Sequence, residues 1–299
     1  MSVKLTDYDA IVVGAGFGGI RTLWELVQTG LTVKCFEAGS DVGSAWYWNR
    51  YPGARTDSEA WDDVQRYLGH VTDHFDLRKK IEFNTRIASA HYSDSQKTWT
   101  ITNPPFTGLK SYTGEWYQAS RWPNKPIDFR GKRVAIVGTG ATGVQIIPKI
   151  APVAKELIVF QRTPNYVLPG RNYTFDEYQK AAIKQNYDIT WNRASQHPFG
   201  LAMVSSGKVV KGLADADKIR QILDSGWESG GFHFQFETFD DLVTDPESNE
   251  IASEYLRQKI RAIVQDPETA EALCPKYLFL SKRPPCGHFY YETFNRPKS

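Results

Sequence analysis

The sequence predicts an α/β protein built from two Rossmann-like nucleotide-binding domains. The first observation is a Gly-x-Gly-x-x-Gly motif in "AIVVGAGFGGIR" at 10–21, and the second is its near twin, "VAIVGTGATGVQ" at 134–145. Each motif follows a short apolar run and opens a segment with helical periodicity, which is the strand–turn–helix order of this fold. The third observation is the length, because 299 residues are enough for two domains.

The composition favours a globular protein that handles small molecules. Hydrophobic residues make up 41% and charged residues 23%, and the formal net charge is only +2. Basic and acidic residues are interspersed, so we expect neither nucleic acid nor a membrane as a partner. Cys35, Cys274 and Cys286 lack metal-ligand spacing and fit idle thiols in a reducing compartment. We therefore expect a cytoplasmic protein without a bound metal; the oligomeric state has no signal in the sequence.

The first nucleotide-binding unit reads as a strand over 10–13, a glycine turn, a helix and a second strand that ends in Glu37. Gly14 permits the tight turn, Gly16 lets the backbone approach a pyrophosphate, and Gly19 allows close helix packing. Glu37 lies near the offset at which an acid accepts hydrogen bonds from a ribose diol. We assign this site to the ADP half of FAD.

The second unit repeats this order around three further glycines, Gly138, Gly140 and Gly143. At the position equivalent to Glu37 it carries Gln161, followed by Arg162 and Thr163. A neutral side chain removes the repulsion against a 2′-phosphate, and an arginine adds a planar fork of donors suited to it. The sequence therefore predicts that the second site binds NADPH. The presence of both sites predicts electron transfer from NADPH to flavin.

The loop after the first unit carries a specific resemblance. "WYWNRYPGARTD" at 46–57 is similar to the flavin-binding loop of Baeyer–Villiger monooxygenases, and it includes Trp46 and Asp57. This loop is rich in Gly, Trp and Arg, and it would cover the pyrophosphate and the isoalloxazine.

A second resemblance lies just before the second glycine motif. The family fingerprint is F-x-G-x-x-x-H-x-x-x-W-P, and this chain has "YTGEWYQASRWP" there. Gly114, Trp122 and Pro123 match, whereas Tyr112 and Gln118 replace the Phe and the His. The Trp-Pro ending favours the Baeyer–Villiger branch over the related flavin N- and S-oxygenases. Gln118 can donate and accept hydrogen bonds but cannot carry a positive charge.

The resemblance implies a flavin monooxygenase that uses NADPH and O2 to insert one oxygen atom next to a ketone carbonyl, giving an ester or lactone. Arg283 is similar to the active-site arginine of the family, which would stabilise the anionic oxygen species at the flavin. Asp57 would pair with Arg283. Lys282 and Arg162 resemble the residues that bind the 2′-phosphate of NADPH, with Thr163 beside them.

The motifs also predict the domain organisation. Residues 1–111 are expected to form the first part of the FAD-binding domain. Residues 112–273 are expected to form the NADPH-binding domain with a helical insertion, and 274–299 to return to the FAD-binding domain.

Two helix starts are predicted in the helical insertion. Thr174 and Glu177 have the spacing of a capping box. Asp266 and Pro267 fit an N-cap residue followed by a first-turn proline. The segment "SEYLRQKIRAIV" between these starts has the periodicity of a helix.

The resemblance covers almost every residue, but two internal segments of the family and the part beyond Ser299 have no counterpart here. We therefore expect an incomplete FAD-binding domain, and two alternatives to an active ketone oxygenase stay open. One is a catalytically inactive nucleotide-binding fragment or an incomplete gene product; the other is a flavin N- or S-oxygenase. We expect the chain alone to bind FAD weakly and to show no ketone-dependent turnover.

Overall fold

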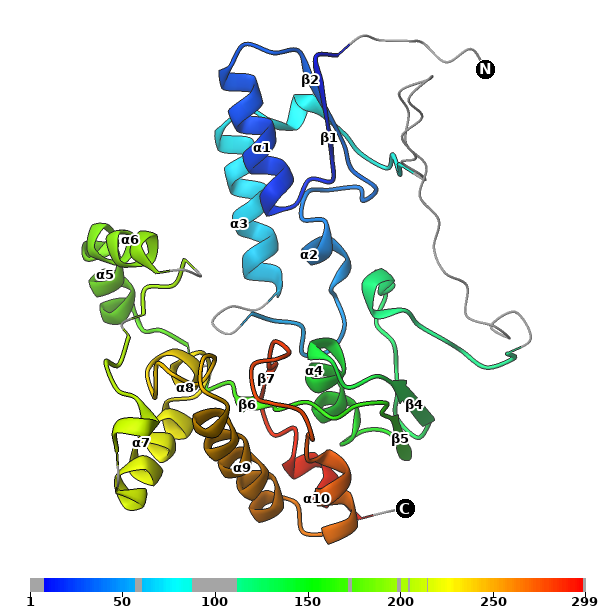
Figure 1. Cartoon of the computed structure of the whole chain (residues 1–299). Helices are drawn as coiled ribbons and strands as arrows, with labels where there is room; N and C mark the ends of the chain where they lie inside the picture. The colour runs from blue at the N-terminus through cyan, green and yellow to red at the C-terminus, as the bar shows by residue number, and fades with distance from the viewer. Residues whose placement is uncertain are drawn as a thin grey trace, which may run out of the picture. The chain divides into compact units, whose positions relative to one another are not determined.

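The protein divides into two compact units, Met1–Pro126 and Ile127–Ser299. We obtained a computed structural model (Figure 1), which describes residues 8–56, 61–87, 112–171, 174–197, 200–203, 205–213 and 215–297. Each unit contains one of the two glycine motifs. The finer division predicted from the sequence, into 1–111, 112–273 and 274–299, remains a prediction.

A parallel sheet and its helices form the first unit. The strands pair in the order β1-β2-β3, and α1 lies beside α3 in Figure 1. The elements are β1 (Ala10–Val13), α1 (Phe17–Gln28), β2 (Val33–Phe36), α2 (Ala45–Trp48), α3 (Trp61–His74), η1 (Arg78–Lys80), β3 (Ile81–Glu82) and η3 (Ala119–Arg121). The strand–turn–helix–strand order predicted for the first motif is confirmed, because an apolar run and a run with helical periodicity flank the glycines.

The second unit combines a parallel β4–β5 pair with a large helical region. Its sheet elements are β4 (Arg133–Val137), α4 (Ala141–Ile150), β5 (Glu156–Phe160), β6 (Leu168–Pro169) and β7 (Cys286–Gly287), with β6 parallel to β7. The helical region consists of α5 (Glu177–Gln185), α6 (Tyr187–Gln196), η4 (Val210–Gly212), α7 (Ala216–Ser229), α8 (His233–Phe236), α9 (Pro246–Ile263), α10 (Pro267–Leu273) and η5 (Glu292–Asn295). The helical insertion predicted from the sequence is thus present.

One predicted helix start is confirmed and one is wrong. Asp266 caps α10 by accepting a hydrogen bond from the Thr269 amide at 3.0 Å, with Pro267 in the first turn. The capping box of α5, however, is built from Asp176 and Gln179 and not from Thr174 and Glu177. Asp caps at least as well as Thr and lies nearer the periodic segment, so α5 begins two residues later than Thr174 predicts.

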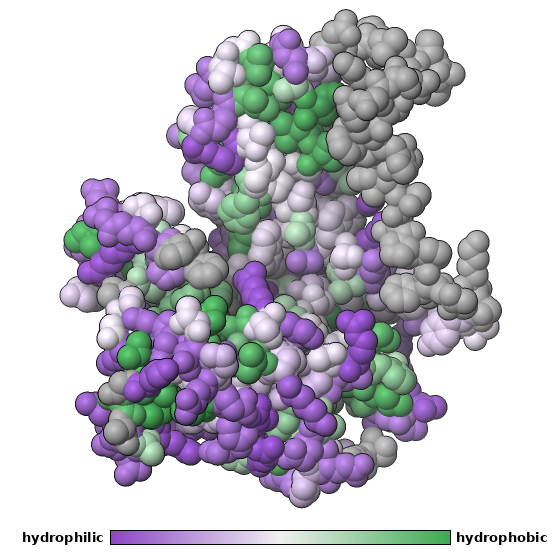
Figure 2. Space-filling view, viewed as in Figure 1, coloured by the Kyte–Doolittle hydropathy of each residue, from purple (hydrophilic) through white to green (hydrophobic). Residues whose placement is uncertain are grey.

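One face of each sheet carries exposed apolar side chains. On β1, Val12 packs into the core, while its neighbour Val13 points the other way and is 64% exposed. On the second sheet, Val137 is 80% and Phe160 is 56% exposed. Figure 2 shows hydrophobic surface over β1 and over β4 and β5. Parallel sheets are normally covered on both faces, so these surfaces are unusual for the fold.

Two classes of feature are absent from the described part of the chain. No helix there combines the length and the hydrophobicity that crossing a bilayer requires. No group of three or more His, Cys, Asp and Glu side chains there has the arrangement of a metal site.

A buried polar network ties α9 to the rest of the second unit. Asn249 donates from Nδ2 to the carbonyls of Leu242 at 2.6 Å and Phe279 at 2.8 Å, and its Oδ1 accepts from Ser253 at 3.0 Å. Asn249 itself is buried. Its side chain therefore satisfies two carbonyl groups and one hydroxyl group that have little access to water.

We predict that Asn249→Ala lowers the free energy of unfolding of the second unit by about 1–3 kcal/mol, because it leaves these buried groups unpaired. Urea unfolding followed by circular dichroism measures the loss. Asn192→Ala is the matched control, because Asn192 is exposed on α6 and its replacement should change stability by about 0.5 kcal/mol or less. Equal effects of the two substitutions would contradict the role assigned to the network.

Candidate functional site

The first candidate site is the glycine turn between β1 and α1. Gly14 has φ +89°, a conformation that favours glycine, and its amide donates to the carbonyl of Phe36 at the end of β2 (2.8 Å). A Cβ at Gly19 would lie only 1.8 Å from the carbonyl oxygen of Gly14. The start of α1 therefore packs directly against the end of β1, as the motif predicts.

The helix start at this turn leaves backbone donors for a ligand. Gly16 is the N-cap residue of α1, and within the described residues no side chain caps the helix there. Uncapped first-turn amides and the positive end of the helix dipole favour an anionic group. The turn therefore has the geometry of a pyrophosphate site.

Glu37 directly follows β2, where the motif predicts a ribose-binding acid, but the residue is only 2% exposed. Oε2 accepts from the Ala15 amide at 2.7 Å and from Ser44 Oγ at 2.9 Å, while Oε1 accepts from the Gly39 amide at 2.7 Å. In this structure Glu37 therefore stabilises the glycine turn and the following loop. Its predicted contact with a ribose remains a prediction.

Cys35 lies on β2 two residues before Glu37 and is fully buried. Burial, with the nearby Glu37 carboxylate, raises the pKa of the Cys35 thiol to about 11. The thiol therefore stays protonated at neutral pH, which agrees with its interpretation as an idle buried cysteine.

The loop after Glu37 carries the aromatic residues of the predicted flavin site. Trp46 lies in α2 and packs partly buried against the core of the first unit. Arg50 donates from Nε to the carbonyl of Tyr47 at 2.8 Å, and its guanidinium lies 4.8 Å from the centre of the Tyr47 ring. Asp57 lies outside the described residues, so its pairing with Arg283 stays a prediction.

The fingerprint segment packs through its tryptophan. Trp122 is buried, with its ring centre 5.8 Å from that of Tyr117 and 6.4 Å from that of Tyr51 in the flavin-like loop. Gln118, which replaces the fingerprint histidine, is exposed and is the N-cap residue that precedes η3. The fingerprint and the flavin-like loop are thus in contact within the first unit.

The second candidate site repeats the construction of the first. Gly138 has φ +102°, and its amide donates to the carbonyl of Phe160 at 2.9 Å. A Cβ at Gly143 would lie 2.2 Å from the carbonyl oxygen of Gly138, and within the described chain no side chain caps α4 at Gly140. The second turn therefore offers backbone amides to an anionic ligand in the same way. We call each glycine turn, with the helix start that follows it, a glycine cradle.

The residues after β5 lie at the carboxyl end of the strand pair, beside this second turn. The Thr139 hydroxyl donates to the carbonyl of Thr163 at 3.3 Å. Arg162 is exposed and makes no ion pair with the described residues. Gln161 donates to the carbonyl of Ala272 at 2.8 Å, while its Oε1 is buried without a hydrogen-bond partner in the described structure. An exposed cation next to the cradle suits a phosphate ligand.

A relay of contacts links Lys282 to the second glycine turn. Its ammonium lies 4.6 Å from the centre of the Tyr277 ring. The Tyr277 hydroxyl donates to Oδ1 of Asn165 at 2.9 Å, and Asn165 donates from Nδ2 to the carbonyl of Thr139 at 2.7 Å. Lys282 is thus held by the same segment that supports the cradle. Sequence reasoning missed Tyr277 and Asn165, and no local pattern singles out Tyr277.

Arg283 is exposed and precedes the short β6–β7 pairing. The carbonyl of Pro285 accepts from the amide of Leu168 at 3.0 Å, which fixes the segment just after Arg283 to β6. Leu280, three residues earlier, has φ +66°, a rare conformation for a side-chain-bearing residue. The backbone on both sides of Lys282 and Arg283 is therefore constrained.

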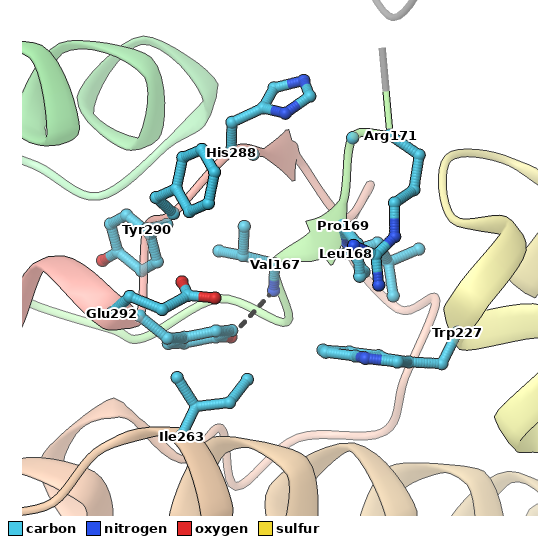
Figure 3. A pocket seen from close by; sticks show the side chains of 13 residues that line it. Val167, Leu168, Pro169, Arg171, Trp227, Ile263, His288, Tyr290 and Glu292 are labelled. Carbon is cyan, nitrogen blue, oxygen red and sulfur yellow. Dashed lines mark hydrogen bonds between the residues drawn. The ribbon is translucent and has the colours of Figure 1, made fainter. Parts of the chain in front are cut away.

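A cavity of about 120 Å³ opens in the second unit. Figure 3 shows Trp227 and Ile263 from the helical region facing Tyr290 and Glu292, and the Tyr291 hydroxyl accepts from the amide of Val167 at 3.0 Å. None of the residues predicted from the sequence as site residues lines it. The cavity nevertheless adjoins α4, because a Cβ at its lining residue Gly287 would lie 2.7 Å from Cγ1 of Val144, the residue after Gly143.

Comparison with known proteins agrees with the geometry. A family described as "NAD(P)-binding Rossmann-like domain" matches residues 12–61. The chain is 35% identical to a Baeyer–Villiger monooxygenase of Pseudooceanicola batsensis over 97% of this chain and 62% of the relative. It is 37% identical to a cyclohexanone 1,2-monooxygenase of an Acinetobacter species (99% and 63%). It is also 35% identical to a phenazine N-monooxygenase of Lysobacter antibioticus (98% and 62%).

Solved structures show the same likeness. A closed crystal structure of cyclohexanone monooxygenase matches with a TM-score of 0.89 at 35% identity, covering 97% of this chain and 63% of that one. A steroid monooxygenase bound to NADP matches with a TM-score of 0.87 at 35% identity (98% and 65%). The chain spans less than two thirds of the length of these relatives.

We predict that Gly19→Ala destabilises the first unit, because its Cβ would overlap the carbonyl of Gly14 and force α1 off the strand. The expected loss is about 1–3 kcal/mol. The control is Gly18→Ala, which lies in the same helical turn with nothing within 4 Å of its Cβ. Gly18→Ala should be neutral or stabilising by up to about 1 kcal/mol. Thermal unfolding of both variants measures the difference, and a Gly19→Ala protein as stable as the control would refute the close packing.

Proposed function

This chain belongs to the Baeyer–Villiger monooxygenase family, and we propose that it forms the FAD- and NADPH-binding part of an enzyme that oxygenates ketones. The reaction inserts one oxygen atom of O2 next to the ketone carbonyl and gives an ester or lactone. The second oxygen atom leaves as water, and NADPH supplies the two electrons. The observation that carries the proposal is the pair of glycine cradles, which are followed by an acid in one unit and by an exposed arginine in the other.

The first cradle fits the ADP half of FAD. The lack of space for a Cβ at Gly19, the positive φ of Gly14 and the uncapped helix at Gly16 all favour a pyrophosphate. Glu37 would accept hydrogen bonds from the ribose, and Trp46 and Asp57 would belong to the loop over the flavin. When bound, flavin and nicotinamide supply the electron transfer and the activation of O2.

The second cradle fits NADPH. Gly138, Gly140 and Gly143 would hold the pyrophosphate, as in the first unit. Arg162, Thr163 and Lys282 would bind the 2′-phosphate, because a guanidinium and an ammonium match its charge. The exposure of Arg162 and the support that Tyr277 gives to Lys282 favour this assignment over NADH.

Arg283 would stabilise negative charge that develops on oxygen during the reaction. A permanent cation with fixed geometry stabilises negative charge that develops on oxygen in a site with little water. Two restraints on the backbone, the positive φ at Leu280 and the anchor at Pro285, support a fixed position for this residue. Asp57 would orient it.

The Trp122–Pro123 ending of the fingerprint supports oxygenation of a ketone over that of nitrogen or sulfur. We also place the protein in the cytoplasm, because Cys35 and Cys274 are buried free thiols.

The cofactor assignment predicts that Arg162→Ala weakens NADPH binding far more than NADH binding. Loss of a charge-assisted phosphate contact costs about 1.5–3 kcal/mol, which corresponds to roughly a 10- to 100-fold rise in Kd. Arg133→Ala is the control, because Arg133 pairs with Glu156 at the opposite end of the same strands. Titration calorimetry with both dinucleotides measures the effect; a similar loss for NADPH and NADH would exclude the assignment.

The reaction is tested in a chimera in which the two missing internal segments and the part beyond Ser299 are supplied by a cyclohexanone monooxygenase. We expect the chimera, and not the chain alone, to form ester or lactone from a panel of cyclic, linear and aryl ketones. Arg283→Ala in the chimera should preserve flavin reduction by NADPH but abolish ester formation, with the electrons released as hydrogen peroxide. Chromatography of the products and a peroxide assay measure both. Undiminished ketone oxygenation in this variant would rule out the role of Arg283.

A further inference from the structure

Ser44 is held in a strained backbone conformation next to the first glycine turn. Its φ is +44° and its ψ is −109°, values that a residue with a side chain rarely adopts. Such conformations persist only where surrounding contacts hold them, and they gather at functional sites. The contacts that hold Ser44 therefore indicate what the residue does.

The Ser44 side chain is bonded to the acid of the first site. Ser44 Oγ donates to Oε2 of Glu37 at 2.9 Å, the same oxygen that accepts from the Ala15 amide at 2.7 Å. Oε1 of Glu37 accepts from the Gly39 amide. A carboxylate offers about four acceptor positions, so Ser44 and the two amides leave about one free.

Ser44 also lies against the surface of the glycine turn itself. A Cβ at Gly16 would lie 3.0 Å from the Cβ of Ser44, and one at Gly14 would lie 3.1 Å from Ser44 Oγ. The role of these glycines is to leave room for the close approach of a pyrophosphate. Ser44 fills part of the space that the absence of side chains at Gly14 and Gly16 creates.

We propose that Ser44 holds the first nucleotide site in a closed state and lowers its affinity for any nucleotide with a free ribose diol. A diol contacts Glu37 fully only after the Ser44 hydroxyl leaves Oε2. This inference rests on the assignment of the first cradle to FAD under the proposed function. It adds a residue that opposes binding, in contrast to the glycines and Glu37, which favour it.

The test compares two substitutions at Ser44 in the full 299-residue chain. Ser44→Ala removes the hydroxyl and keeps the Cβ, while Ser44→Gly also removes the steric contact and suits a positive φ. Titration calorimetry with ADP should show about a tenfold lower Kd for Ser44→Ala, the factor expected when one hydrogen bond to a charged group no longer competes. Ser44→Gly should give a gain at least as large, and FAD should follow ADP.

Two controls separate this role from a merely structural one. Ser40→Ala, in the same loop, removes a hydroxyl that pairs with the Tyr47 hydroxyl at 2.8 Å, and it should leave the Kd for ADP unchanged. With 2′,3′-dideoxy-ADP, which lacks the diol, the gain of Ser44→Ala should disappear. General loosening of the loop would affect both nucleotides alike.

The outcomes distinguish this inference from the assignment on which it rests. If ADP binds the wild type and both Ser44 variants equally, or binds the variants more weakly, the inference is overturned and the FAD assignment stands. The same holds if the gain of Ser44→Ala is equal for ADP and for 2′,3′-dideoxy-ADP. If neither ADP nor FAD binds the wild type or any variant, the FAD assignment fails and the inference fails with it.

Discussion

The contact between a glycine carbonyl and the start of a helix determines the architecture of both candidate sites. In the first unit the Gly14 carbonyl leaves no space for a Cβ at Gly19, and in the second unit the Gly138 carbonyl leaves none at Gly143. Each helix must therefore begin directly against the end of its strand. This packing directs the first-turn amides toward the carboxyl end of the sheet. In the first unit, Glu37 lies at this end because it directly follows β2. The identity of the residue at that position is the basis on which we propose different ligands for the two turns.

Local patterns in the sequence were enough to predict these turns, because strand, turn and helix are contiguous. The bounds of β1 and α1 follow from an apolar run and from helical periodicity, and Asp266 acts as the N-cap that its position before Pro267 predicts. The capping box assigned to Thr174 failed for an equally local reason. Asp176 is a competing cap two residues later, and spacing alone does not rank two candidates of similar strength.

The remaining features depend on contacts between distant parts of the chain, which periodicity does not reveal. Tyr277 lies on the far side of the helical region from Asn165 in the sequence, yet their side chains meet and support Lys282. Glu37 fits its motif, but the motif does not predict that Ser44 shares its carboxylate. The covered face of each sheet was predictable from apolar patterning, whereas the exposure of Val137 on the other face was not.

Because Cys35 is buried, the rate at which its thiol is alkylated can report how often the first unit opens. Alkylating reagents attack the thiolate, and this thiol is both inaccessible and protonated at neutral pH. Labelling must therefore wait for the sheet around β2 to open, so its rate reports the frequency of that opening. A nucleotide that binds the folded first unit but not the opened one slows the labelling in proportion to its saturation of the site. The occupancy of the first cradle can thus be followed through a thiol that never touches the ligand.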